Sequence, residues 1–271
     1  MASAVPSLQA FRLLIDPQLP GARNMAVDEA LLRCMAPDGA AVLRLYGFAP
    51  ACVSLGRFQT VGDLADDVAR IRDGVDVVRR PTGGRAVLHD DEVTYAVVLG
   101  RHHVQPFTKR AAYRTSAALL LRLLGALGVR GAVHPGDRTA PAADADPDCY
   151  HATGEYEITA GAKKLVGSAQ ITTRDAALQH GSIPLSTSYS RIARYLRERG
   201  SAREEGAIPG ATSVAVESGR RWRYHEALHT LAAAARAHLG AEPSTLSEAE
   251  VRLARDLETT RYGRSQWTCA R

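Results

Sequence analysis

The stretch of residues 155–183 constrains the fold of this chain more than any other. It contains three runs typical of β-strands, joined by two short polar turns, at 155–159, 164–171 and 176–183. Connections this short join antiparallel neighbours, because a parallel pair needs a crossover of roughly a dozen residues or more. The sequence therefore predicts an antiparallel meander in the second half of the chain.

Other predicted elements surround this meander. Strand-like runs occur at 41–46, 51–55, 75–80 and 93–99, and helical patterns at 24–35, 64–71, 109–128, 188–197, 224–239 and 247–259. Because the strands come in hairpins and do not alternate singly with helices, we predict an α+β fold with mixed or antiparallel sheets flanked by helices. Asn24 is expected to cap the first helix.

The whole chain, residues 1–271, is expected to form a single domain. Residues 135–147 are rich in Pro, Ala and Asp and lack periodicity, so we predict a mobile loop there. From about residue 220 the C-terminal segment is expected to be helical.

Charge, cysteine spacing and hydropathy exclude several classes of function. The formal net charge of +5 is dispersed along the chain, which indicates acidic protein partners and argues against nucleic acid. The four cysteines form no CxxC pair, so we expect no metal site and no redox dithiol. No apolar run reaches the roughly 20 residues of a membrane span, and no signal peptide is evident. We therefore expect a cytoplasmic protein without a membrane partner.

Cys149 is the candidate nucleophile. It stands in the string PDCYH, after the predicted loop and before the first strand of the meander. Unlike Cys34 and Cys52, it has no apolar neighbours on its N-terminal side. A thiol attacks only as the thiolate, and because its reference pKa is about 8.5 it needs a nearby cation or backbone donors. An exposed, inert cysteine is the alternative that the residues alone leave open.

Lys164 is the candidate cation for that thiol. Strand alternation predicts two faces, one with Lys164, Val166, Ser168 and Gln170 and the other with Leu165, Gly167, Ala169 and Ile171. The first face is polar, so we expect it to line a site, and the second to face the core. Gly167 leaves room for a ligand or a backbone to approach. A solvated lysine on an edge strand is the alternative.

A basic glycine turn follows the strand predicted at 75–80. In its string RRPTGGR, Gly83 and Gly84 permit positive φ and leave backbone N–H groups open to an anion or a carbonyl. The string is neither a Walker A nor a GxGxxG pattern, and a tight basic turn is the alternative. His89 and His180 are candidate acid–base groups, or else hydrogen-bonded structural histidines.

Together these strings resemble the lipoate–protein ligase and octanoyltransferase superfamily, whose catalytic fold is similar to that of biotin protein ligase. The resemblance rests on residues 24–30, 54–59, 79–89, 164–170 and 179–182, and on a C-terminal Tyr262…Trp267-Thr268 ending. The Gram-positive-type cysteine octanoyltransferase carries its nucleophile in a Cys-Phe stretch before the lysine-containing strand. Here Cys149-Tyr150 occupies that place, with tyrosine instead of phenylalanine.

The resemblance implies an acyltransferase of lipoate biosynthesis. Octanoate would pass from acyl carrier protein to Cys149, assisted by Lys164, and then to a lysine of a lipoyl-domain protein such as glycine cleavage H protein or a dehydrogenase E2 subunit. No cofactor is expected. The expected substrate-binding residues are Arg79, Thr82, Gly83, Gly84, Arg85, His89, Gly167, Ser168, Ala169, Gln170, His180 and Gly181. The apolar side chains of 93–99 are expected to wall the acyl chain.

Three alternatives stay open at this point. An ATP-dependent lipoate–protein ligase would use the glycine turn and Lys164 for an adenylate, with ATP and Mg as cofactors. An amidotransferase would move octanoate between two lipoyl proteins through the same cysteine. An acyl-binding module without turnover would leave Cys149 and Lys164 without a catalytic role.

Overall fold

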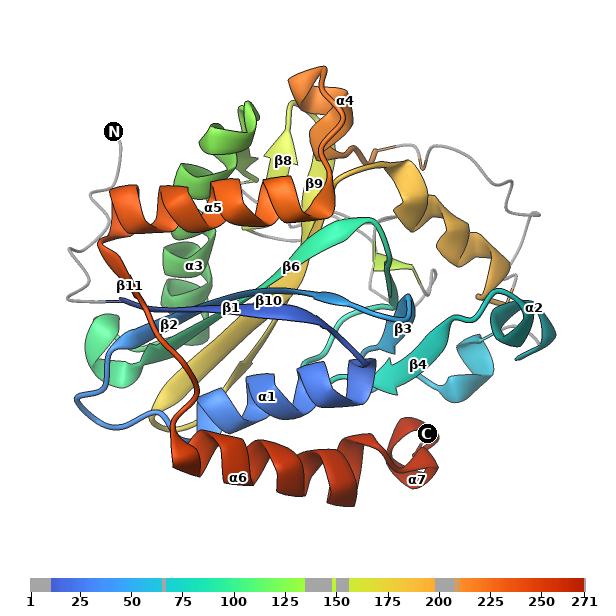
Figure 1. Cartoon of the computed structure of the whole chain (residues 1–271), viewed down its shortest axis with the longest axis horizontal. Helices are drawn as coiled ribbons and strands as arrows, with labels where there is room; N and C mark the ends of the chain where they lie inside the picture. The colour runs from blue at the N-terminus through green and yellow to red at the C-terminus, as the bar shows by residue number, and fades with distance from the viewer. Residues whose placement is uncertain are drawn as a thin grey trace.

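The fold is built on a mixed sheet that has eight strands within the described part of the chain (Figure 1). The computed structural model describes residues 11–64, 67–134, 148–149, 156–197, 208 and 210–270. The order in the sheet is β11 (Ala241–Pro243), β1 (Phe11–Leu19), β2 (Ala41–Phe48), β6 (Glu92–Gly100), β10 (Ala176–Pro184), β9 (Lys163–Thr172), β8 (Ile158–Ala160) and β7 (Ala132–Val133). The loop predicted at 135–147 lies outside these ranges.

The pairing of the central strands confirms the predicted meander. β10 pairs antiparallel with both β6 and β9, and β9 pairs antiparallel with β8. Gly181 of β10 lies opposite Ser168 of β9. A Cβ added at Gly181 would lie only 2.0 Å from the carbonyl oxygen of Gly167. A residue without a side chain at 181 therefore permits these two strands to approach.

A second, three-stranded sheet lies at one end of the strands of the first (Figure 1). Its order is β4 (Asp76–Arg79), β3 (Cys52–Leu55) and β5 (Val87–His89). β3 pairs parallel with β4 and antiparallel with β5. With its two glycines, the segment 81–91 is predicted from sequence to be a loop, and this prediction is wrong at β5, because Val87 and Leu88 pair with β3. A strand of three residues is too short to show an alternating pattern.

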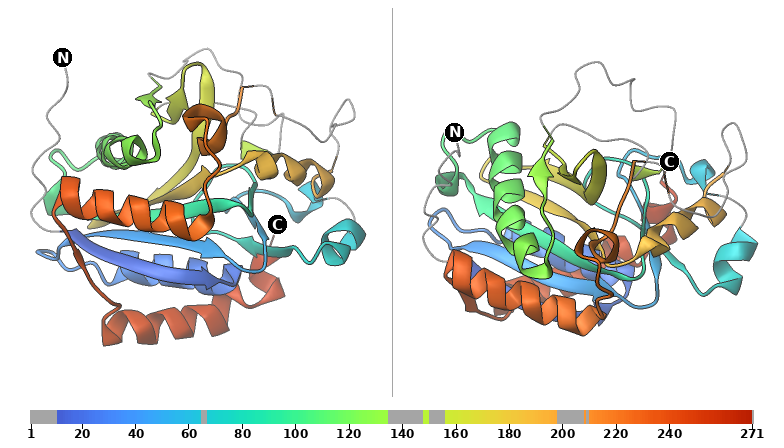
Figure 2. Two further views of the ribbon diagram at one scale, coloured as in Figure 1. Left: turned by 45° about the horizontal axis from the view of Figure 1, so that its top comes forward. Right: turned by 90° about the horizontal axis from the view of Figure 1, so that it is seen from above.

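Helices cover both faces of the large sheet, which confirms the predicted α+β class (Figures 1 and 2). One face carries α3 (Lys109–Leu124) and α5 (Tyr224–Leu239), and the other carries α1 (Gly21–Arg33) and α6 (Glu248–Leu257). The short helices are α2 (Asp67–Arg72), α4 (Val214–Ser218) and α7 (Ser265–Thr268). Within the described ranges no helix has the length and apolar character needed to cross a membrane.

Several predicted boundaries differ from the structure. Helix α1 begins at Gly21, after Pro20, so the prediction that Asn24 caps it is wrong. The Asn24 amide is buried and donates to the carbonyls of Leu19 and Gly47, which ties α1 to β1 and β2. The helix predicted at 188–197 is a 3₁₀ segment, Thr187–Arg194. Strands β1 and β11 were not predicted, because β1 is half exposed and β11 has three residues.

We predict that Gly181→Ala destabilises the fold, because the new methyl group would collide with the backbone of β9. The expected loss is about 1–3 kcal/mol in the free energy of unfolding, measured by urea denaturation. Gly125→Ala is the matched control, since Gly125 has helical φ and nothing within 4 Å of an added Cβ. Equal stability of the two variants would contradict the close approach of β9 and β10.

Candidate functional site

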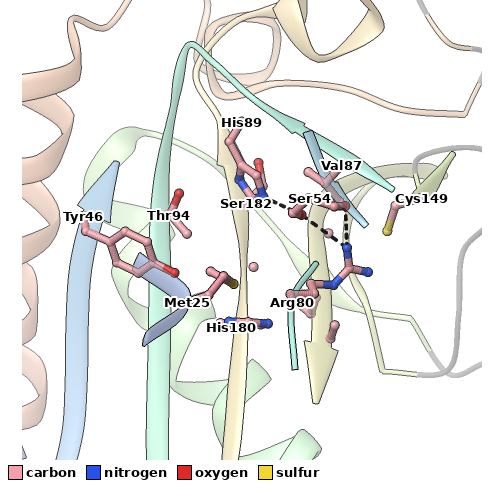
Figure 3. A pocket seen from close by; sticks show the side chains of 14 residues that line it. Met25, Tyr46, Ser54, Arg80, Val87, His89, Thr94, Cys149, His180 and Ser182 are labelled. Atoms are coloured by element: carbon pink, nitrogen blue, oxygen red, sulfur yellow. Dashed lines mark hydrogen bonds between the residues drawn. The ribbon is translucent and has the colours of Figure 1, made fainter. Parts of the chain in front are cut away.

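A small cavity lies where the large and small sheets meet (Figure 3). Side chains from α1, from both sheets and from the segment that carries Cys149 enclose it. Its walls are Met25, Tyr46, Ser54, Arg80, Val87, His89, Thr94, Cys149, Gly167, Ser168, Ala169, His180, Gly181 and Ser182. The expected apolar wall from residues 93–99 is wrong for this cavity, because β6 contributes only Thr94. The apolar side chains of 93–99 pack instead into the two cores.

Cys149 stands at the edge of the cavity and is half-buried. Asp148 forms a parallel bridge with Ala86, and the Cys149 N–H donates to the Ala86 carbonyl at 3.0 Å. The backbone of the cysteine is thereby fixed to the segment just before β5. The thiol is reachable from the cavity and held by hydrogen bonding in a defined place.

Lys164 is buried, with 1% of its surface exposed, and reaches Cys149 from β9. Its Nζ lies 3.5 Å from the Cys149 Sγ, 2.8 Å from the Cys149 carbonyl oxygen and 2.6 Å from Glu157 Oε1. Burial by itself would lower the pKa of Lys164. The charges of Cys149 and Glu157 outweigh burial and raise that pKa above its ordinary value. Lys164 is therefore an ammonium that faces a sulfur and a carboxylate.

Arg80 is the second cation of the cavity. Its guanidinium donates to the carbonyls of Ser54, Gly83 and Arg85 and to the Ser54 hydroxyl. Among the described residues these acceptors are all neutral, so no carboxylate cancels its charge. Burial lowers the pKa of Arg80 to about 10, and the charge of Cys149 opposes that fall. Arg80 thus stays charged at neutral pH and favours negative charge in the cavity.

Two buried chains of hydrogen bonds, each with a carboxylate, an imidazole and a hydroxyl, support the cavity wall. In the first, His180 lies between Asp28 at 2.8 Å and the Thr82 hydroxyl at 2.7 Å. Because a carboxylate only accepts, the His180 Nδ1–H donates to Asp28 and Nε2 accepts from Thr82. Burial lowers the pKa of His180, although Asp28 opposes this effect. The imidazole is therefore neutral at pH 7.

The second chain runs from Glu92 through His89 to Ser54. His89 lies 2.6 Å from Glu92 and 2.8 Å from the Ser54 hydroxyl. Ser54 in turn accepts from Arg80 at 3.2 Å. The chain therefore connects a buried carboxylate to the guanidinium that enters the cavity, and it fixes the position of that guanidinium.

The structure brings together only some of the residues expected from sequence. Those that line the cavity are His89, Gly167, Ser168, Ala169, His180, Gly181 and Cys149. Lys164 and Thr82 adjoin it through Cys149 and His180. Residues 83–85 form the turn whose carbonyls hold Arg80.

Arg79 and Gln170 lie outside the cavity lining. The Arg79 guanidinium donates to the carbonyls of Gly56, Gln59 and Thr268. Gln170 lies against the first turn of α3.

The predicted assignment of the two faces of β9 is wrong in part. The Ser168 hydroxyl forms a hydrogen bond with the Tyr95 hydroxyl, at 2.7 Å between the two oxygens, on the face of the sheet that α3 covers. Ala169 instead lies opposite His180 and contributes to the cavity wall. The small side chains leave open space, so smallness at 167 and 169 was the signal for a cavity and not for the core.

Sequence reasoning missed Arg80, Ser54 and Glu157. Sequence does not indicate which of the two adjacent arginines, Arg79 or Arg80, enters the cavity, so Arg80 was not predicted. Glu157 carried a signal, since alternation with Tyr156 and Ile158 places it on the opposite face of their strand. The register shift between Ile158 and Thr159, which sequence does not reveal, sets its position relative to Lys164.

Comparisons of sequence confirm the resemblance. A family model described as the lipoyl protein ligase A/B catalytic domain matches residues 20–235. The octanoyltransferase LipM of Symbiobacterium thermophilum is 36% identical over 273 residues, which cover 95% of this chain and 97% of that protein. The octanoyltransferase LipM of Brevibacillus brevis is 30% identical, over 97% of this chain and 100% of that protein.

Solved structures show the same fold. A lipoate-protein ligase A bound with ATP superposes with a TM-score of 0.78 at 24% identity, over 96% of this chain and 99% of that one. A bipartite lipoate protein ligase of Thermoplasma acidophilum, studied with its E2 lipoyl domain, gives 0.76 at 22% identity, over 96% of both chains. With its catalytic-domain match and its full-length relatives, this chain belongs to the lipoyl protein ligase A/B catalytic domain family.

Proposed function

We propose that this enzyme is an octanoyl-[acyl carrier protein]:protein N-octanoyltransferase that carries octanoate on Cys149 as a thioester. The observation that carries the proposal is the buried Lys164 ammonium, 3.5 Å from the Cys149 sulfur. A cation at this distance favours the thiolate, which is the reactive form of the nucleophile. The names of the full-length relatives support octanoyl transfer.

In the first half-reaction the Cys149 thiolate attacks the thioester carbonyl of the donor. A new bond forms between the Cys149 sulfur and the acyl carbon, the donor's carbon–sulfur bond breaks, and the donor thiol leaves as a thiolate. Negative charge develops on the carbonyl oxygen in the transition state. Arg80 and Lys164 provide positive charge around the cavity, where low polarity strengthens their effect.

In the second half-reaction the amine of an acceptor lysine attacks the Cys149 thioester. A carbon–nitrogen bond forms, the carbon–sulfur bond breaks, and Cys149 recovers its thiolate. The attacking nitrogen releases one proton to water. Exchange between thioesters is nearly neutral and amide formation is downhill, so the proposal needs neither ATP nor another cofactor.

The wall of the cavity offers apolar surface to an acyl chain. Met25, Val87 and Ala169 are apolar residues of that wall, which Cys149 also lines. Each buried CH₂ contributes about 0.8 kcal/mol, so eight carbons supply several kcal/mol of binding.

Octanoyl–acyl carrier protein is the proposed donor, and a lipoyl-domain protein such as H protein or an E2 subunit is the proposed acceptor. The net charge of +5 favours acidic proteins of this kind.

Intact mass spectrometry tests the thioester. We predict that incubation with octanoyl–acyl carrier protein, without ATP, adds one octanoyl group that hydroxylamine removes. Cys149→Ala abolishes the adduct because the attacking sulfur is absent. Cys269→Ala retains it and serves as the control, since Cys269 is an exposed cysteine that does not line the cavity.

Two results would contradict the thioester route. One is the absence of an adduct together with modification of a lipoyl domain from free lipoate and ATP, which would establish the ligase alternative. The other is an adduct stable to hydroxylamine. If octanoyl-lipoyl protein loads Cys149 and octanoyl–acyl carrier protein does not, the enzyme is an amidotransferase.

Alkylation of Cys149 tests the role of Arg80. We predict that Arg80→Met raises, by about one unit, the pH at which iodoacetamide alkylation of Cys149 reaches half its maximal rate, because the thiolate loses a nearby cation. Arg79→Met is the matched control: Arg79 is equally buried but binds backbone carbonyls outside the cavity. A similar shift in both variants would assign the effect to altered folding and not to the Arg80 charge.

A further inference from the structure

Glu157 is a buried carboxylate whose role the two half-reactions leave unexplained. It precedes β8 and accepts from Lys164 at 2.6 Å, and the two side chains are 9% and 1% exposed. Its backbone carbonyl accepts from the His134 N–H at 2.8 Å. The pairing of β7 with β8 therefore anchors the backbone that carries the carboxylate.

The backbone of Lys164 is equally constrained. Its N–H donates to the Gly210 carbonyl at 2.7 Å, and its own carbonyl accepts from the Thr212 N–H at 2.9 Å. The backbones of both partners of the pair are thus fixed by main-chain hydrogen bonds. The ammonium and the carboxylate do not depend on each other alone for their positions.

The charge around Lys164 changes during the proposed reaction. Before acyl transfer, its ammonium faces two anions, the Cys149 thiolate and the Glu157 carboxylate. After acyl transfer the sulfur is a neutral thioester, and the thiolate no longer balances the ammonium. A buried ammonium without a counter-ion tends to release its proton. Without another counter-ion, Lys164 would therefore tend to lose its proton in the acyl-enzyme.

We propose that Glu157 is a positioning residue that keeps Lys164 charged and in place while octanoate occupies Cys149. This inference rests on the proposed thioester function. In the second half-reaction the carbon–sulfur bond breaks and the electron pair returns to sulfur. Lys164 must then be an ammonium to stabilise the departing thiolate. Glu157 supplies the counter-ion throughout that interval.

The same carboxylate has the opposite effect on the free enzyme. Its negative charge lies beside the same ammonium and disfavours the formation of a second anion on Cys149. Removal of the charge should therefore ease thiolate formation and impair acyl transfer to the acceptor. A residue that only supports the fold would instead impair both steps together.

Other titratable groups around the pair keep their charge between pH 7 and 9. Tyr95 and Tyr113 stay neutral, because burial raises the pKa of Tyr95 to about 12 and that of Tyr113 well above its ordinary value. Arg80 stays charged, with a pKa of about 10. Changes in this window therefore report on Cys149 and Lys164.

The test uses Glu157→Gln, which keeps the size and the acceptor oxygen but removes the charge. The octanoyl-enzyme is prepared first, and its transfer to a lipoyl-domain lysine is followed by intact mass. We expect transfer to slow by about tenfold or more, so that the octanoyl-enzyme accumulates. We also expect the pH of half-maximal iodoacetamide alkylation of Cys149 to fall. Glu157→Asp, which keeps the charge, should restore part of the transfer rate.

Glu250→Gln is the matched control, since Glu250 is also buried and pairs with Arg12 at 2.7 Å, outside the cavity lining. It should leave both readouts at the wild-type values. Transfer from Glu157→Gln at the wild-type rate, or an alkylation midpoint that moves upward, would overturn the proposal. Absence of any octanoyl adduct on the wild-type enzyme would instead refute the thioester function itself.

A measurement on the wild-type enzyme covers the case in which Glu157→Gln does not fold. If Glu157 keeps Lys164 charged in the acyl-enzyme, transfer should not decline between pH 7 and 9, because the ordinary lysine pKa is about 10.4. A decline that begins near neutral pH would show that Lys164 loses its proton once the sulfur is acylated. That result would overturn the proposed role of Glu157.

Discussion

Four buried basic side chains determine how the segments of this protein fit together: Arg44, Arg79, Arg80 and Lys164, each 4% exposed or less. A buried cation is costly unless hydrogen bonds and opposite charge surround it. Two carboxylates stabilise the Arg44 guanidinium, because Asp16 and Asp28 each place an oxygen 2.7 Å from one of its nitrogens. Burial by itself would raise the pKa of Asp28, but Arg44 and His180 hold that pKa below its ordinary value. Asp28 is therefore a carboxylate that pairs with the Arg44 guanidinium. Strand β2, helix α1 and strand β10 are thereby joined.

Arg79 joins β4 to the C-terminal segment through hydrogen bonds to backbone carbonyls. Its guanidinium donates to the carbonyls of Trp267 and Thr268, and the Trp267 indole N–H donates back to the Arg79 carbonyl at 2.8 Å. Nearby, Tyr262 and Arg261 both donate to Glu29 of α1. The C-terminal Tyr…Trp ending thus closes α6 and α7 over α1 and β4. The family strings at the two ends of the sequence form one contact in space.

The parts predicted from sequence are those that local pattern determines. Short turns and alternation were sufficient for the meander, and an apolar helix pattern for α5, whose observed bounds are those predicted. The sequence does not reveal which distant segments pair with one another, so the strands β1, β5 and β11 were not predicted. The site shows the same limit. The proximity of Cys149 to Lys164 was anticipated through the family strings, whereas Glu157 depends on a register shift and Arg80 on which arginine turns inward.

The neutral state of the buried imidazole explains why the charge of the cavity belongs to Arg80 and Lys164. His180 lies between Asp28 and Thr82, and its pKa is lowered by burial and by the charge of Arg80. Protonation would place a further cation in a region that already holds an uncancelled guanidinium. The folded state resists that charge more than the unfolded chain does, so acidification below the ordinary histidine pKa of about 6.5 costs stability. At neutral pH the hydroxyl of Thr82 is then free to donate to an uncharged ring, and positive potential is concentrated at the end of the cavity where Cys149 lies.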